Sequence, residues 1–125
     1  TVAKKYNLDL NKTYEGIKIS SGNSFVHETE SQVILNGSYN INFTMDLVEK
    51  DMSLFNKLSE DQDIELEIAP FVLDIFKDAK EKFGSRAWSS MVVKRLEDKY
   101  GINFREKGFP DELVDNEPEE KGQEV

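Results

Sequence analysis

Apolar residues recur along this chain every three or four positions, with polar residues between them. This is the spacing of an α-helix that buries one face. No segment shows the sustained alternation of apolar and polar residues that indicates a β-strand. The pattern therefore predicts an all-α fold, a multi-helix bundle of about four to six helices.

Capping and breaking residues indicate where these helices begin and end. Asp9 or Asn11 suits the start of a short helix, and Ser24 suits the start of a second helix that Gly37 ends. Pro70 fits the first turn of the most regular amphipathic segment. The expected helices cover residues 9–19, 24–36, about 42 or 46 to 58, 70–83 and about 85 or 88 to 100, and residues 2–6 have the pattern of the end of a further helix.

The length of 125 residues, 38% of them hydrophobic, fits one compact domain with a modest core. We assign residues 1–110 to this domain and residues 111–125 to an acidic tail. The formal net charge is −9, and seven acids against one lysine give the tail −6 of it. The rest of the chain has no basic excess, so we expect neither nucleic acid nor an anionic membrane as a partner.

The chain contains no cysteine, which excludes a disulfide framework and suits a reducing compartment. No apolar run approaches the length of a membrane span, and no signal-peptide pattern opens the chain. We therefore expect a cytoplasmic protein. Matches to the glycosylation pattern at Asn11, Asn36 and Asn42 are attributed to chance.

Most motifs for catalysis or metal binding are missing or incomplete. His27 is the only histidine and lacks the second histidine of a zinc-binding helix, so we expect a surface or partly buried residue. The segment after Asp9 has Tyr14 where a calcium loop requires glycine, and Ser20 where it requires glutamate. No glycine-rich phosphate loop and no serine nucleophile motif are present. We expect no catalytic residue and no metal site within these residues.

An acid interrupts the apolar stripe of the helix expected near residues 42–58. Residues of this stripe follow one another at spacings of four, four, three and four, and so share one helical face: Phe43, Leu47, Asp51, Leu54 and Leu58. A buried carboxylate is costly unless it is paired or hydrogen-bonded. Taken alone, the pattern favours an internal partner for Asp51, and Lys50 at the edge of the stripe is expected to be solvated.

A resemblance to a known family adds to this picture. It is carried by three stretches: GNSFVHETESQVILNGSYNINFTMDLVEKDMSLF, IAPFVLDIFKDAKEKFG and WSSMVVKRLED. The most telling element is Phe43, followed eight residues later by Asp51 of a Lys-Asp pair, in a helix after the turn at residues 37–39. Over roughly residues 1–100, the chain resembles the C-terminal helical domain of β-hydroxyacid dehydrogenases, relatives of 3-hydroxyisobutyrate dehydrogenase and 6-phosphogluconate dehydrogenase.

The resemblance implies a parent enzyme that uses NAD or NADP. Such an enzyme moves a hydride between the nicotinamide and the hydroxyl-bearing carbon of a small 3-hydroxy acid. In the family, a Rossmann domain binds the dinucleotide and a lysine on a long interdomain helix is the general acid/base. Both would lie upstream of Thr1, so this fragment alone is expected to be inactive.

The resemblance also implies roles for three residues of the expected helix. Lys50 matches the family lysine that approaches the nicotinamide end of the cofactor, where a cation can steer a phosphate or a substrate carboxylate. Phe43 and Asp51 match residues that line the substrate pocket or hold its shape. The interrupted stripe would then face a cleft instead of a closed core. The family domain also provides much of the subunit interface, so we expect a homodimer or a higher homo-oligomer.

Two segments depart from the family pattern. Ala87 stands where the family often has an aspartate, two residues before the serine that opens the last helix, so we expect Ser85 or Ser89 to cap that helix. After Tyr100 the chain extends past the usual domain end. This extension has two readings, disorder after residue 110 or a docked segment that uses Phe104, Phe109 and Leu113.

A second reading of the whole chain is a free-standing helical interaction module. Phe71, Ile75 and Phe76 would line an apolar groove that grips a partner. A regular apolar face more commonly packs inside its own domain. The sequence upstream of Thr1 distinguishes the two readings.

Overall fold

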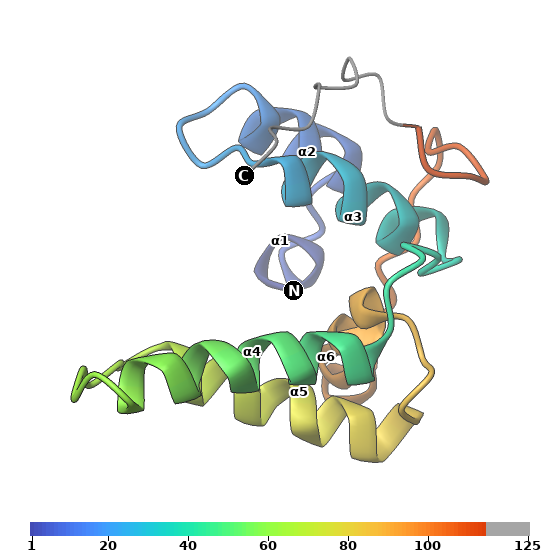
Figure 1. The fold of residues 1–125 in the computed structure, drawn as a ribbon. Helices are drawn as coiled ribbons and strands as arrows, with labels where there is room; N and C mark the ends of the chain where they lie inside the picture. The colour runs from blue at the N-terminus through green and yellow to red at the C-terminus, as the bar shows by residue number, and fades with distance from the viewer. Residues whose placement is uncertain (115–125) are drawn as a thin grey trace.

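The computed structural model describes residues 1–114, which form six α-helices and one 3₁₀ helix (Figure 1). Within that range no β-strand forms, and Thr44 and Trp88 make a single antiparallel bridge. The predicted all-α fold is confirmed. The elements are α1 (Val2–Lys5), α2 (Leu10–Lys18), α3 (Phe25–Asn36), α4 (Met45–Glu60), α5 (Ala69–Phe83), η1 (Ser89–Val93) and α6 (Lys94–Tyr100).

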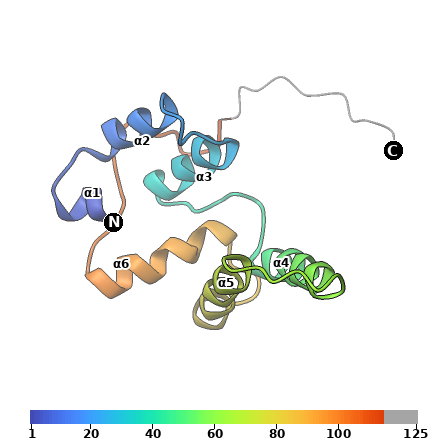
Figure 2. The same ribbon diagram turned by 90° about the vertical axis from the view of Figure 1, so that its left-hand side faces the viewer.

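The helices form two parts, which Figures 1 and 2 show from directions at right angles. In one part, α4 and α5 lie side by side as a long hairpin. In the other, α2 packs against α3, and α1 contacts α2. The 3₁₀ helix η1 contacts α3, α5 and α6, so it joins the two parts.

Local signals explain most of the helix ends. The side chain of Asp9 accepts a hydrogen bond from the backbone N–H of Lys12, and Ser24 does the same for His27. Gly37 ends α3 with a φ of 93°, in the left-handed region that glycine adopts without a steric penalty. These caps and this stop are confirmed.

The start of α4 agrees within one residue with the later of the two predicted starts, near residue 46, and the predicted place of Phe43 on the helix is what differs. The helix begins at Met45 with Thr44 as its N-cap, and Asp46 lies in its first turn. Phe43 therefore precedes the helix instead of lying on its face. The reason is tertiary, because the backbone N–H of Met45 donates to the carbonyl of Ala87 at 2.9 Å. Local capping preference could not reveal a partner so distant in the sequence.

The expected cap of the last helix is wrong. Neither Ser85 nor Ser89 caps it; a 3₁₀ turn begins at Ser89, with Trp88 as an N-cap that makes no side-chain hydrogen bond. A serine of this turn makes a tertiary hydrogen bond instead. The hydroxyl of Ser90 donates to the carbonyl of Tyr39 at 2.6 Å and is fully buried.

The core lies between α2, α3 and the residues that follow α6. Its buried cluster consists of Leu10, Tyr14, Leu35 and Phe104. The extension after α6 therefore docks on the bundle, at least as far as residue 114. Phe109 meets the ring of Tyr14 edge to face, with the ring centroids 5.3 Å apart. Residues 115–125, most of the predicted acidic tail, lie outside the described residues.

None of the helices within residues 1–114 is long and apolar enough to cross a membrane.

Candidate functional site

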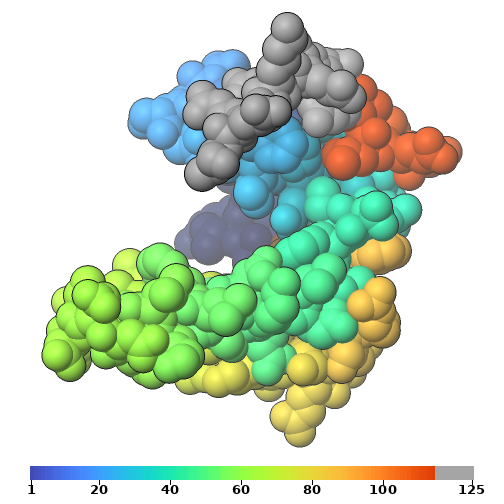
Figure 3. Space-filling model, viewed as in Figure 1, coloured from blue at the N-terminus to red at the C-terminus, as the bar shows by residue number. Residues whose placement is uncertain are grey.

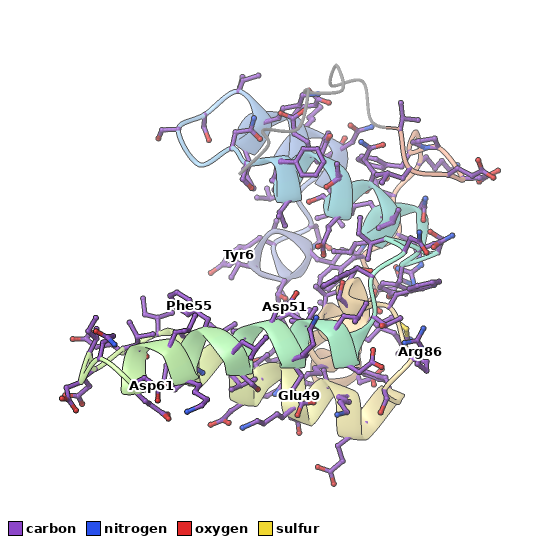
Figure 4. The ribbon with its side chains drawn as sticks, in the orientation of Figure 1. Tyr6, Glu49, Asp51, Phe55, Asp61 and Arg86 are labelled. Carbon is purple, nitrogen blue, oxygen red and sulfur yellow. The ribbon has the colours of Figure 1, made fainter. Side chains whose placement is uncertain are left out.

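Lys50 and Asp51 lie on the surface of α4. Their side chains are 59% and 55% exposed, and Nζ of Lys50 is 3.0 Å from Oδ1 of Asp51. Figure 4 shows Asp51 on the side of α4 that faces away from α5. The pair is not sealed inside the bundle, so the internal partner that the pattern favoured for Asp51 is absent from the described part of the chain. Both charged groups are free to meet a ligand or another domain.

Phe43 lies just before this helix. Its side chain is 37% exposed, and its carbonyl accepts a hydrogen bond from the backbone N–H of Ser89 at 2.8 Å. The ring therefore remains available at the surface while its backbone is fixed to η1. Phe43 lies just before α4, and the Lys50–Asp51 pair lies within α4, about two turns further along the chain.

Apolar side chains of α4 are not confined to its buried face. The face against α5 contains polar groups, among them buried Asn56 and partly buried Glu49, whose carboxylate lies 2.7 Å from Nζ of Lys80. Away from this face, three large apolar side chains are each more than half exposed: Leu54, Phe55 and Leu58. A helix that leaves its apolar stripe uncovered normally meets another surface in the complete assembly.

Figure 3 shows the molecule hollowed between α4 and the part built from α1, α2 and α3. A groove of about 280 Å³ lies between α2 and α3 on one side and η1 and α6 on the other. Its lining is mostly apolar and includes Ile17, Ile34, Val93, Leu96 and Phe104.

His27 and Ser31 are the polar groups on the α3 side of this groove. Nε2 of His27 is 3.0 Å from the carbonyl oxygen of Tyr14, and Nδ1 is 3.3 Å from the hydroxyl of Ser31. The imidazole is partly buried, as predicted, and both of its nitrogens have partners within the fold. Within residues 1–114, no group of three or more histidine, cysteine, aspartate or glutamate side chains has an arrangement that holds a metal ion.

A second charged group lies at the N-terminus of α4. The Thr44 hydroxyl donates to the carboxylate of Asp46, and Nη1 of Arg86 lies 3.2 Å from Oδ2 of the same carboxylate. The Thr44 hydrogen bond, then Arg86, lower the pKa of Asp46 below its ordinary value. An ionised carboxylate here is favoured by the partial positive charge of the helix N-terminus. This arrangement stabilises the start of α4.

The sequence interpretation missed a buried ionic cluster. Glu97 in α6 is only 6% exposed and accepts hydrogen bonds from the Tyr39 hydroxyl, from the backbone N–H of Phe104 at 2.9 Å and from Nη1 of Arg105 at 3.3 Å. Burial, then the hydrogen bond with Glu97, raise the pKa of Tyr39 to about 12. The available signal was Glu97 itself, an acid four residues after Val93 on the apolar side of its helix.

The exposed residues of α4 are suited to binding and not to catalysis. Among the described residues, the exposed surface of α4 presents the Lys50–Asp51 pair and several apolar side chains, and no activated nucleophile accompanies them. Such a face can bind an anionic group and cover an apolar surface.

The comparisons with known proteins agree with this fold. A family model described as NAD-binding of NADP-dependent 3-hydroxyisobutyrate dehydrogenase matches residues 1–96. The chain is also similar to a crystal structure of 3-hydroxyisobutyrate dehydrogenase from Salmonella typhimurium, with 23% sequence identity and a TM-score of 0.70 over 75% of this chain. The match covers 33% of that protein, so the chain spans about a third of its length. No curated protein matches the chain.

Proposed function

Because the chain belongs to the family of the NAD-binding domain of NADP-dependent 3-hydroxyisobutyrate dehydrogenase, we propose that it is the helical domain of an NAD(P)-dependent 3-hydroxy acid dehydrogenase. In this proposal it supplies one wall of the substrate cleft and part of the subunit interface. The parent enzyme is an oxidoreductase that acts on the hydroxyl-bearing carbon of a small hydroxy acid. The cytoplasmic location predicted from the sequence belongs to the same proposal.

The observation that carries the proposal is the open face of α4. The Lys50–Asp51 pair is more than half exposed, and an exposed ion pair contributes only about 0–1 kcal/mol. Lys50 can therefore exchange Asp51 for a cofactor phosphate or a substrate carboxylate at little cost. Phe43 just before α4 and Asp51 within it border the substrate in this proposal. These roles follow from the family resemblance and agree with the exposure of all three residues.

In this proposal the chain contacts the cofactor only at the nicotinamide end. NAD or NADP needs a strand and a glycine-rich turn for its phosphates, and residues 1–114 form neither. Lys50 is the residue we assign to the cofactor, as a cation near its nicotinamide end. When bound, the cofactor supplies the hydride chemistry. The dinucleotide site and the acid/base lysine belong to the rest of the parent enzyme, so we expect the purified 125-residue chain to turn over no hydroxy acid.

The test is Lys50→Ala in the parent enzyme, compared with Lys57→Ala. Both lysines are exposed on α4, and each is paired with a nearby aspartate. The two variants therefore remove the same charge from similar positions on one helix. We expect Lys50→Ala to raise the KM for cofactor or substrate about tenfold or more, the loss of one charge-assisted contact. The melting temperature should stay within about 2 °C for both variants. Unchanged kinetics, or a collapse of the melting temperature for Lys50→Ala, contradicts the assignment.

The subunit interface is proposed from exposed apolar residues at the end of the α4–α5 hairpin: Leu54, Phe55, Leu58, Ile64, Ile68 and Phe71. We expect the isolated chain to associate, most simply as a dimer. Size-exclusion chromatography with light scattering tests this. Detection of a 14.4 kDa species alone contradicts it.

The free-standing interaction module remains the second candidate, and one observation favours it. Phe71 is 67% exposed, although Ile75 and Phe76 are partly buried. The gene upstream of Thr1 separates the two proposals. A strand, a G-x-G-x-x-G turn and a lysine on a long helix support the dehydrogenase, whereas a start codon beside Thr1 supports the module.

A further inference from the structure

Residues 102–114 run along the surface of α2 and α3, and side-chain amides hold their backbone. Figure 2 shows this segment returning from α6 toward the other part of the molecule. Three donors from α2 and α3 bind its carbonyl oxygens: Asn11 to Lys107 at 3.3 Å, Gln32 to Val114 at 3.1 Å and Asn36 to Pro110 at 2.6 Å. Because these bonds go to the main chain, they fix the path of the segment.

Arg105 is the point at which this segment reaches the end of α3. Its guanidinium donates to the carbonyl of Ile34 at 3.0 Å and to the hydroxyl oxygen of Tyr39 at 2.8 Å, and it also pairs with Glu97. Its stem packs over Gly37, where a Cβ atom would lie only 2.2 Å from Nε. The arginine therefore fits a space that exists because residue 37 has no side chain.

The connection between α3 and α4 needs such support. Tyr39 and Asn42 both have positive φ angles, 54° and 56°, a conformation that non-glycine residues rarely adopt and that costs of order 1 kcal/mol or more. Strained residues persist only when their surroundings hold them. Tyr39 is held at its N–H by the carbonyl of Val33, at its carbonyl by Ser90 and at its hydroxyl by Glu97 and Arg105.

We propose that residues 102–114 are a strap that holds the connection between α3 and α4 in place, with Arg105 as its positioning residue. The connection carries Phe43 and ends at Thr44, the N-cap of α4. The strap therefore sets where α4 starts and how its exposed face is presented. The family match ends at residue 96, so the strap itself lies outside the matched region. The inference stands independently of the proposed function, because it concerns backbone geometry.

The test is hydrogen exchange on the full 125-residue chain, comparing Arg105→Met with Arg95→Met. Arg95 is a matched control, a partly buried arginine that pairs with Asp78 and links α6 to α5. Arg105→Met should accelerate exchange at the amides of Tyr39 and Ile41 at least about tenfold, while α4 and α5 keep wild-type protection. Arg95→Met should leave those two amides unchanged.

Trp88 supplies a second measurement. It is the only tryptophan, it is partly buried, and its backbone pairs with Thr44 at the start of α4. Acrylamide should quench its emission more strongly in Arg105→Met than in Arg95→Met. An Arg105→Lys variant, which keeps the charge but not the fork of donors, should fall between wild type and Arg105→Met.

Phe109→Ala keeps the inference testable if Arg105→Met fails to fold, because it loosens the strap at Tyr14 and leaves Arg105 intact. Faster exchange at both residues 104–109 and the Tyr39 amide supports the proposal. Faster exchange in residues 104–109 alone overturns it. The proposal also fails if Arg105→Met leaves Tyr39 protected, or if every helix loses protection equally.

Discussion

In the α4–α5 hairpin, Asp51 interrupts an apolar stripe and lies exposed beside Lys50. In the part built from α3, α6 and the strap, Glu97 interrupts another apolar face and is 6% exposed. Both acids occupy helical positions where the sequence pattern expects an apolar residue. Their surroundings differ in one respect: Glu97 has three hydrogen-bond donors from other segments, and Asp51 has one neighbour on its own helix.

The difference shows what an acid in an apolar stripe indicates. A carboxylate can be buried only where donors converge on it, because desolvation costs more than a single pairing returns. At Glu97 those donors come from Tyr39, 58 residues away, and from the strap. At Asp51 they do not converge, and the stripe itself stays open. The first arrangement stabilises the fold, whereas the second leaves a surface for something else to cover.

Substitution of the buried acid Glu97 should destabilise the protein most. Glu97→Ala leaves the Tyr39 hydroxyl, the Phe104 N–H and the Arg105 guanidinium without their acceptor. Removing one partner of a buried charge pair costs about 3–5 kcal/mol of unfolding free energy. Urea unfolding followed by circular dichroism measures the change.

Asp98→Ala is the control for that loss. Asp98 is the next residue of α6, and its carboxylate pairs with Lys82 at 2.8 Å while 45% exposed. We expect a much smaller loss than for Glu97→Ala, because exposed ion pairs contribute little to stability. Equal losses for the two variants would show that Glu97 is no more than a surface charge, and would remove the contrast with Asp51.

A second prediction concerns alkaline pH. The pKa of Tyr39 is raised to about 12 in the folded chain, above its ordinary value of 10.0. The folded state therefore favours the protonated phenol. Its contribution to stability is complete below pH 10 and is lost as the pH rises toward 12. Two pKa units correspond to roughly 2–3 kcal/mol. Tyr39→Phe should remove this part of the pH dependence of urea unfolding.

Tyr100→Phe is the matched control, because Tyr100 is exposed at the end of α6. Its alkaline unfolding curve should follow that of the wild type. If Tyr39→Phe keeps the full alkaline loss, the loss belongs to other groups, and the buried cluster is less tightly coupled to Tyr39 than its geometry indicates.

The difference between the two parts also explains what the sequence could predict. The caps at Asp9 and Ser24 and the stop at Gly37 are local interactions, and local patterns predicted them. The start of α4 depends on a hydrogen bond to Ala87, and the burial of Glu97 depends on three donors from two other segments. Those partners are distant in the sequence, so periodicity does not reveal them.

The exposure of Phe43, Lys50 and Asp51 could be predicted from the sequence only in part. The helix that carries the pair was predictable from its spacing, and the residues were identified by a resemblance to a family. Spacing specifies which residues share a face but not which neighbour covers that face. Leu54 and Leu58 are uncovered because α5 packs on the opposite side of α4, and only the tertiary arrangement shows this.

A third prediction concerns the end of α3, where the side chain of Arg105 packs over Gly37. Gly37→Ala places a Cβ atom 2.2 Å from Nε of Arg105, at a φ of +93°. Gly101→Ala, just after α6, is the control, because Gly101 also has a left-handed backbone, with a φ of +60°, and its added Cβ atom meets nothing within 4 Å. The control should lose about 1 kcal/mol from backbone strain alone, and Gly37→Ala about 2 kcal/mol. Chemical unfolding measures both.

A double-mutant cycle isolates the contact with the strap. In an Arg105→Ala background the clash disappears, so Gly37→Ala should then cost no more than Gly101→Ala does. If the cost of Gly37→Ala is the same with and without Arg105, the arginine does not press on the end of α3. The hairpin and the strapped part would then be equally independent of the C-terminal segment.

The smallest expected effect is at the exposed acid. Asp51→Ala removes an ion pair that is more than half exposed and worth about 0–1 kcal/mol, and alanine is the better helix former by about 0.5 kcal/mol. The two terms nearly cancel, so the free energy of unfolding of the isolated chain should change by less than about 0.5 kcal/mol. Urea unfolding at low and high salt checks this, and high salt should abolish any residual difference. A loss above about 1.5 kcal/mol would mean that Asp51 has a structural partner after all. The open face of α4 would then need no second surface to explain its charge.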